Sequence, residues 1–247
     1  MPNKNKIIFS LLAVMIGALL AGCSIFPTAD VEEEQRPTQE IDESTDTPGE
    51  ITDIESGADI AAKYEIKFIA DWSSETHPDL YPPGAHFSPF VAYSHDDSLN
   101  GKIFNVGEIP SPGIEEMAET GATKILINEI QNIIESNSAH AQTKGSVFNS
   151  PGSDSSMLEL TQDHSNVTFV SMLAPSPDWF VGNTINLFKN GKWVESTSLD
   201  LITYDAGGDS GERLTSPDQD TNPKEPITIF NDNLQHLGSI VLVRIFE

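Results

Sequence analysis

The sequence predicts an all-β domain, folded as an antiparallel β-sandwich with one helical insertion. Short segments rich in β-branched and aromatic residues recur along it, turn-forming clusters separate them, and one longer segment has helical periodicity instead. Short strands with turn-rich connections are typical of a sandwich, because each strand has an apolar face that must be buried against a second sheet.

The strand-like segments are recognised by their alternation. In residues 64–72, Ile66, Phe68 and Ala70 alternate with polar neighbours, which is typical of a half-buried strand. Asn190-Gly191 separates two other strand-like pieces and predicts a hairpin turn. Strand-like patterns also occur at residues 166–174, 183–189, 198–204 and 239–246.

Residues 113–136 carry the helical insertion. Their apolar side chains follow three-and-four spacing, so the segment is an amphipathic helix or a helix pair broken near Gly121. The apolar stripe can serve as a partner-binding face or as part of the core. We expect core packing, because an all-β domain with a single helical insertion needs that stripe covered.

The N-terminal residues have the organisation of a secretory signal peptide, assigned to residues 1–22. A positively charged start precedes an apolar run at 7–20. Residues 20–23, Leu-Ala-Gly-Cys, resemble the bacterial lipobox, in which the cysteine is lipidated. Cys23 is the only cysteine, so the exported domain has no disulfide. We expect a lipoprotein anchored in the cell envelope through Cys23 rather than a protein with a plain signal peptide, and Ser24 favours the outer membrane or cell surface if the host is Gram-negative.

Residues 23–62 predict a flexible acidic tether. They are rich in Asp, Glu, Thr and Pro and have no aromatic side chain after Phe26. Too little apolar surface is available to offset the entropy of ordering such a segment. The whole chain has a formal net charge of −25 and repels phosphate backbones, so nucleic acid is not expected as a partner. The folded domain is expected over residues 63–247.

Residues 208–211, Gly-Asp-Ser-Gly, match the letters around the nucleophile of trypsin-like proteases. A serine nucleophile needs a histidine within hydrogen-bonding reach and backbone donors for the oxyanion. His95 is the only loosely suitable histidine, and Glu212 would place a carboxylate beside the developing negative charge. An envelope hydrolase that uses Ser210 or a metal-activated water is therefore kept as the alternative function.

Carboxylates in turn-rich surroundings form a second kind of candidate site. Asp178 follows two prolines and precedes bulky apolar residues, where an unpaired charge is costly. Asp205 and Asp209 lie in a glycine-rich turn directly after an apolar strand. Several oxygens around one point suit a hard cation such as calcium, which takes about six to eight oxygen ligands. The same residues also suit Asx turns, in which each aspartate accepts hydrogen bonds from nearby amides. Spacing alone leaves both interpretations open.

Specific motifs resemble one known family. The segments at 64–96, 113–121 ("GIEEMAETG"), 170–182 ("VSMLAPSPDWFVG") and 199–211 ("LDLITYDAGGDSG") occur in the order and spacing of the spondin domain of animal extracellular matrix proteins. The resemblance covers essentially residues 64–247. It implies a C2-like antiparallel β-sandwich with a bound divalent cation, used for adhesion and recognition rather than for catalysis.

The resemblance also implies ligands for the cation, which we take to be calcium. Carried over residue by residue, they are Glu159, Asp178 and Asp205, and Asp209 matches the second aspartate of its motif. Gly208 stands where the family usually has threonine, and residues 218–237 form a shorter stretch than in the animal proteins.

The sequence therefore predicts a lipid-anchored binding or adhesion module of the cell envelope, not an enzyme. Its expected partners are a membrane, through the N-terminal lipid, and a surface protein or glycan. Besides the hydrolase, a purely structural envelope lipoprotein is kept as an alternative.

Overall fold

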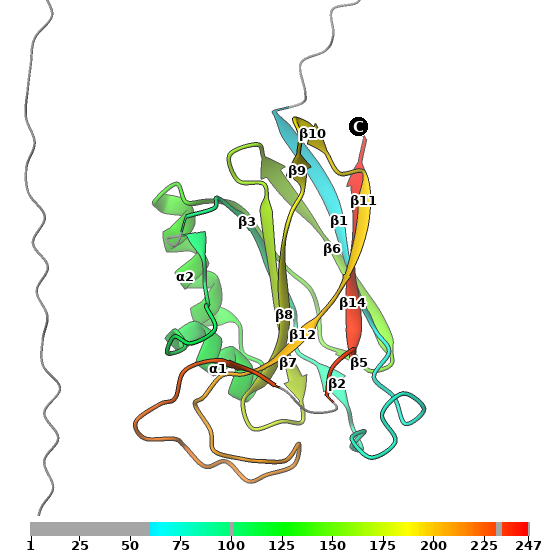
Figure 1. The fold of residues 1–247 in the computed structure, drawn as a ribbon, viewed down its shortest axis with the longest axis vertical. Coiled ribbons are helices and arrows are strands. Elements are labelled where there is room, and N and C mark those ends of the chain that lie inside the picture. The colour runs from blue at the N-terminus through cyan, green and yellow to red at the C-terminus, as the bar shows by residue number, and fades with distance from the viewer. Residues whose placement is uncertain (1–59, 99–100, 231–233, 247) are drawn as a thin grey trace, which may run out of the picture. The chain divides into compact units, whose positions relative to one another are not determined.

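The computed structural model describes residues 60–98, 101–230 and 234–246 (Figure 1). The predicted signal peptide, Cys23 and the tether up to residue 59 lie outside these ranges. Within them, no helix has the length and apolar character needed to cross a membrane.

The described chain consists mainly of β-strands, with two helices between β3 and β4. The helices are α1 (Pro112–Thr120) and α2 (Lys124–Glu135). The strands are β1 (Ala61–Ala70), β2 (His86–Phe87), β3 (Val91–His95), β4 (Ala139–Lys144), β5 (Phe148–Asn149), β6 (Gly152–Thr161), β7 (Asn166–Ala174), β8 (Trp179–Asn186), β9 (Phe188–Lys189), β10 (Lys192–Trp193), β11 (Ser196–Asp200), β12 (Ile202–Asp205), β13 (Thr228–Ile229) and β14 (Gly238–Ile245).

Two large antiparallel sheets form separate layers (Figure 1), and β9 and β10 form a small two-stranded sheet of their own. The smaller of the two large sheets has the strand order β11-β14-β1-β6. The larger sheet follows the order β13-β12-β8-β7-β2-β5, and β3 pairs with both β7 and β4. The structure confirms the predicted all-β sandwich with a helical insertion.

Aromatic and aliphatic side chains fill the space between the sheets. Ile66, Phe68 and Ala70 of β1 are buried, as their alternation predicted, and Tyr64 is buried with them. The Phe68 ring contacts the ring of Phe169 on β7 of the other sheet, with centroids 5.1 Å apart. Burial of each such side chain contributes roughly 1.5–3 kcal/mol, so this core is a main source of the stability of the domain.

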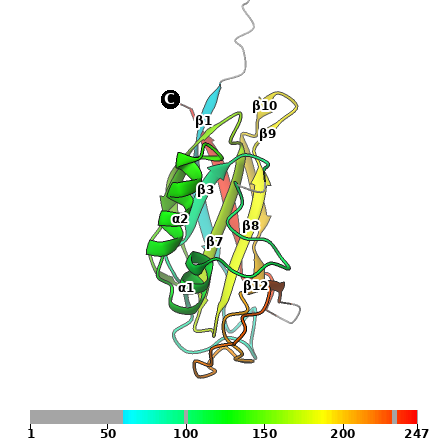
Figure 2. The ribbon, with the colours of Figure 1, turned by 90° about the vertical axis from the view of Figure 1, so that its left-hand side faces the viewer.

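The helices cover the other face of the larger sheet (Figure 2). Every residue of β7 is buried, because one face of the strand packs on the smaller sheet and the other on the helices. Ile114 and Met117 of α1, and Leu126 and Ile130 of α2, are fully buried in this second layer. The predicted apolar stripe is therefore core, and the helical segment is a pair. Gly121 separates the two helices at φ 72°, a left-handed conformation that favours glycine.

The strand predicted at 198–204 is two strands that belong to different sheets. β11 pairs with β14 in the smaller sheet, whereas β12 pairs with β8 in the larger one. Buried Leu201 lies between them. Apolar residues continue through this crossing, so the sequence pattern could not reveal the change of partner.

Other strands begin earlier than predicted. β8 begins at Trp179 rather than at residue 183, because its first four residues are buried on both faces and show no alternation. β1 begins at Ala61, so the predicted tether overlaps it by two residues, Ala61 and Ala62, and Ala62 is buried. The hairpin at Asn190-Gly191 is confirmed between β9 and β10, with φ values of 54° and 75°.

Candidate metal centre

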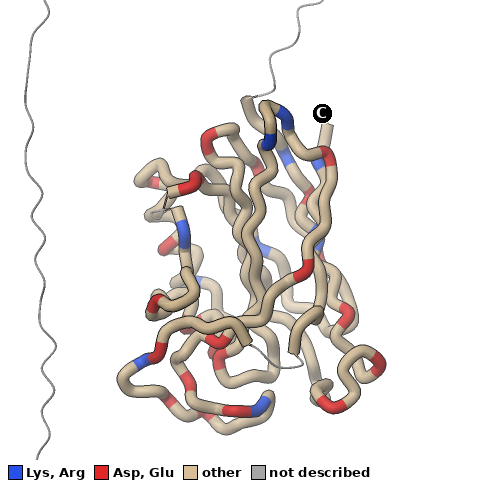
Figure 3. The backbone as a smooth tube through the Cα atoms, in the orientation of Figure 1, with Lys and Arg blue, Asp and Glu red and all other residues tan. Residues whose placement is uncertain are grey.

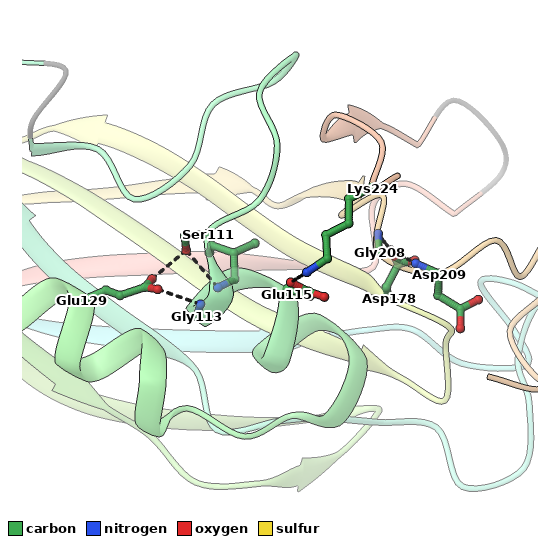
Figure 4. A network of polar contacts seen from close by, with 9 residues as sticks. Ser111, Gly113, Glu115, Glu129, Asp178, Gly208, Asp209 and Lys224 are labelled. Atoms are coloured by element: carbon green, nitrogen blue, oxygen red, sulfur yellow. Dashed lines mark hydrogen bonds and ion pairs between the residues drawn. The ribbon is translucent and has the colours of Figure 1, made fainter. Parts of the chain in front are cut away.

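Acidic side chains from three parts of the chain approach one another where β7 turns into β8 (Figure 4). Asp178 lies in this turn and is fully buried. Its Oδ2 atom accepts hydrogen bonds from the amides of Gly208, at 2.7 Å, and Asp209, at 3.0 Å. Its Oδ1 atom is buried and has no hydrogen-bond partner among the described residues. Burial, followed by the charge of Asp205, raises the pKa of Asp178 to about 6.

Asp205 ends β12 beside this turn. Its Oδ1 atom accepts a hydrogen bond of 2.9 Å from the amide of Gly207, two residues further on, which is an Asx turn. Gly207 has a φ of 79°, and a Cβ atom there would lie 2.2 Å from the carbonyl oxygen of Glu225. Burial raises the pKa of Asp205, and the charges of Glu225 and Asp209 raise it further.

Asp209 shapes the loop with both of its carboxylate oxygens. Oδ1 accepts a hydrogen bond of 2.6 Å from the amide of Gly211, and Oδ2 accepts one of 2.7 Å from the amide of Gln219. The Asx-turn interpretation therefore accounts for Asp209 and for one oxygen of Asp205. It leaves the buried Oδ1 atom of Asp178 without an explanation.

Glu119 is a member of the acidic group that the sequence analysis missed. A Cβ atom on Gly208 would lie 2.6 Å from Glu119 Oε1 and 3.7 Å from Asp178 Oδ2, so these two carboxylates face the same small space. Burial, followed by the charges of Glu115 and Asp178, raises the pKa of Glu119 to about 7. The available signal was the spacing of Glu115 and Glu119, which places both on one face of α1.

The surroundings of Gly208 explain why glycine fits here, at a position where the family usually has threonine. A Cβ atom at this position would be too close to the Glu119 Oε1 atom, at 2.6 Å. A threonine here would displace the end of the Glu119 side chain. The glycine is what allows the Glu119 carboxylate to approach the backbone of this loop.

Glu159 is not brought to this group. It lies on β6, pairs with Lys63 of β1 and is exposed. β6 ends in the short turn that leads into β7, whereas Asp178 follows the far end of β7. Glu159 and Asp178 therefore lie at opposite ends of the sandwich. The sequence could not reveal this separation, because β6 was not recognised as a strand.

The carboxylates lie near one another but do not form a complete coordination site. Among the described residues, no group of three or more His, Cys, Asp or Glu side chains is arranged to hold a metal ion. The donor chemistry nevertheless fits a hard cation, because the group offers only oxygens and one of them is buried and unpaired. Among Asp178, Asp205 and Glu119, the charge of Asp178 acts on Glu119, and the charge of Asp205 acts on Asp178, so these three carboxylates are the candidate donors, without the geometry of a formed site.

The charges around the group are mostly negative. Figure 3 shows Asp and Glu along the loops at this end of the domain. Lys224 forms an ion pair with Glu115 on α1 (Figure 4). Asp218 and Asp220 also raise the pKa of Glu119, so the negative potential extends beyond the buried core of the group.

Ser210 is not placed as a catalytic nucleophile would be. Its hydroxyl donates a hydrogen bond of 3.1 Å to the carbonyl of Gln219. The ring of His95 is buried elsewhere and contacts the Thr168 hydroxyl, at 2.8 Å, and the Asp96 carbonyl, at 2.7 Å. The resemblance of residues 208–211 to a protease motif therefore describes a loop, in which Ser210 holds a turn.

Comparison with known proteins gives a consistent result. The Spondin_N family model matches residues 62–238. Spondin-2 of Homo sapiens is 36% identical over 178 residues, which cover 68% of this chain and 52% of Spondin-2. Spondin-1 of Rattus norvegicus is 33% identical over 202 residues, which cover 78% of this chain and 24% of Spondin-1. The chain thus matches about half of the length of Spondin-2 and about a quarter of Spondin-1. With a family match over most of its length and relatives above 30% identity, the chain belongs to the spondin N-terminal domain family.

Proposed function

We propose that this chain is a recognition and adhesion module of the cell envelope, that it binds calcium through its spondin domain, and that a lipid on Cys23 anchors it. Membership of the spondin family supports a binding role rather than an enzymatic one. The lipobox-like residues before Cys23 support the anchor, and the acidic tether would let the domain reach away from the membrane.

One observation carries the calcium proposal. The carboxylate of Asp178 is fully buried, and its Oδ1 atom has no hydrogen-bond partner among the described residues. A buried carboxylate oxygen without a partner costs free energy unless a cation or a proton compensates it. Its neighbours Asp205 and Glu119 are also carboxylates with raised pKa values, so a divalent cation would relieve all three.

Asp178, Asp205 and Glu119 would supply oxygen ligands, together with backbone carbonyls or water. Asp209 would act by holding the loop through Gly211 and Gln219. Calcium, when bound, supplies positive charge that fixes the loops at this end of the sandwich. Loops fixed in this way form a rigid surface for a protein or glycan partner.

The calcium proposal is tested by thermal unfolding of the full chain in calcium and in chelator. A ligand that binds only the native state stabilises it by roughly 3 kcal/mol at a hundredfold excess over its dissociation constant. The double variant Asp178→Asn, Asp205→Asn should lose this stabilisation. Glu159→Gln is the matched control at the other end of the domain and should keep it. Absence of any calcium-dependent shift in the wild type would refute the metal site.

The recognition proposal needs its own test. The full chain, displayed on vesicles, is used to capture proteins and glycans from envelope extracts in calcium and in chelator. Calcium-dependent capture that the double variant loses would support a recognition role. Equal capture in both conditions, combined with an intact calcium-dependent shift in melting temperature, would reduce the metal to a stabilising role, as in a structural lipoprotein.

A further inference from the structure

Two adjoining pockets open beside the metal centre, and together they are called the loop groove here. Their volumes are about 600 Å³ and about 540 Å³. Both are lined by Trp179, Phe230 and Glu212. The groove is therefore one continuous surface with two halves that differ in chemistry.

The first half is mainly apolar, and hydrogen bonds hold part of its wall. Leu80, Tyr81 and Leu214 line it. The Tyr81 hydroxyl donates to the carbonyl of Ser150 at 2.7 Å, and the Trp72 indole donates to the carbonyl of Leu80 at 2.8 Å. These bonds hold the wall in place, so this half is suited to receive an apolar side chain without rearrangement.

The second half is acidic. Glu225 lines it together with Asp205, Asp209 and the shared Glu212. Glu212 and Glu225 are exposed, and within the described residues no hydrogen bond or ion pair engages either carboxylate. Arg213 is the only Lys or Arg side chain that lines the groove in the part of the chain that the structure describes. The charge of the groove therefore selects a cationic group.

The floor between the two halves is Trp179, whose side chain is almost completely buried. Its ring lies against that of Phe230, with centroids 4.3 Å apart. Its indole N–H faces the Asp205 carboxylate and lowers the pKa of that group, yet it makes no hydrogen bond of normal geometry among the described residues. This N–H is buried, so it belongs to the floor of the groove and is not a contact for an incoming ligand.

We propose that the loop groove binds an extended segment of a partner protein, with a basic side chain at Glu212 and Glu225 and an apolar side chain in the pocket of Leu80 and Tyr81. A peptide can present a basic side chain and an apolar side chain from one extended segment, which matches the two halves of the groove. A neutral glycan would leave the carboxylates without a counter-charge, and an anionic surface would be repelled.

This inference rests on the proposed recognition function but does not require the metal. Glu212 and Glu225 are not among the residues proposed to hold calcium. A chain that fails to bind calcium could still bind through the groove. A chain that captures a partner equally well without these two carboxylates would keep its recognition function and lose this site.

The test is an array of peptides, probed with the full chain in calcium and in chelator. Each peptide has about 12 residues, which span up to about 40 Å when extended, and contains one Arg and one Leu or Phe at every spacing in a Gly and Ser background. Affinities of the best binder are then measured in solution for wild type and variants.

We expect at least one peptide to bind, and the double variant Glu212→Gln, Glu225→Gln to weaken binding by about tenfold or more. Replacing the Arg of the peptide by citrulline should weaken binding similarly. Glu159→Gln removes one exposed negative charge at the opposite end of the domain and should have no effect. Phe230→Ala tests the apolar half, and its melting temperature reports whether it folds.

Three results would overturn the inference. The first is that no peptide in the array binds. The second is that the best peptide binds the double variant as tightly as the wild type. The third is that a neutral oligosaccharide, and no peptide, binds in a manner that depends on Glu212 and Glu225.

Discussion

Asp178 and Gly208 are thirty positions apart in the sequence, yet the Asp178 Oδ2 atom accepts a hydrogen bond of 2.7 Å from the Gly208 amide. This contact ties the β7–β8 turn to the loop after β12. It uses one carboxylate oxygen and leaves the other buried without a partner among the described residues. Backbone hydrogen bonds thus fix the position of the Asp178 carboxylate.

Replacing Asp178 by Asn should have opposite effects in chelator and in calcium. In chelator at neutral pH, the variant should be at least as stable as the wild type, because the amide removes an uncompensated buried charge and its oxygen can still accept from Gly208 and Asp209. In calcium, the variant should be less stable than the wild type. Chemical denaturation under both conditions checks this, and a loss of several kcal/mol in chelator would contradict it.

The stability of the metal-free protein should fall as pH rises from about 4 to about 7. The pKa values of Asp178 and Glu119 in the folded protein, about 6 and about 7, lie above the values near 4 of an unfolded chain. At these two carboxyl groups the folded state therefore binds more protons than the unfolded state across this interval. The stability that the two groups contribute is fully present below pH 4 and is lost as pH rises through the folded pKa values.

The measurement is the free energy of unfolding in chelator across this pH range, for the wild type and for Asp178→Asn. The difference between the two profiles isolates Asp178, because the asparagine does not titrate. Calcium should flatten the dependence. A wild-type profile parallel to that of the variant would show that Asp178 does not carry the effect.

Gly207→Ala should destabilise the protein more than Gly191→Ala does. Both glycines have positive φ values, 79° and 75°, so both substitutions carry a backbone cost of roughly 1 kcal/mol. Only at Gly207 would the new Cβ atom meet backbone, 2.2 Å from the Glu225 carbonyl oxygen, whereas nothing lies within 4 Å of a Cβ at Gly191. Denaturation of the two variants checks the difference, and equal losses would contradict the close approach.

Phe68→Ala should cost roughly 3–5 kcal/mol, as is typical of deleting a large buried side chain. Phe68 has no exposed surface and lies among the rings of Phe87, Phe148 and Phe169. Its neighbour Ile69 points to the outer face of the smaller sheet and is 38% exposed. Ile69→Ala should therefore cost about 1 kcal/mol or less, and similar losses for both variants would mean that the register of β1 is wrong.

Local patterns predicted much of the fold. The alternation in β1, the break at Gly121 and the hairpin at Asn190-Gly191 all follow from the conformations that neighbouring residues permit, and the structure confirms each of them. The segment predicted as one strand at 198–204 is two strands in different sheets, because a change of sheet at Leu201 leaves the apolar pattern unbroken. Residues 152–161 were missed altogether, since their outward side chains are mostly polar and their pairing with β1 is set by distant residues.

The candidate site was predicted only in part, because local sequence marks some of its residues and not others. Asp178 and Asp205 are marked by their turn-rich surroundings, and the resemblance to spondin domains pointed to both. Glu119 lies on a helix far away in the sequence, and Glu159 lies on a strand that leads away from the site. The distance of Glu119 from the site depends on how α1 packs on the larger sheet, and that of Glu159 depends on which strands pair.

The sequence by itself determined the kind of domain and the residues that turn the chain, because short-range sterics and apolar periodicity act between neighbours. The family followed from the resemblance of its motifs to spondin domains. The tertiary structure decided which carboxylates meet, because packing α1 on the larger sheet brings Glu119 to Gly208 and Asp178. It also separated Glu159 from them by the length of the sandwich. The repulsion between Glu119 and Asp178 is a consequence of that packing, because the two residues are distant in the sequence.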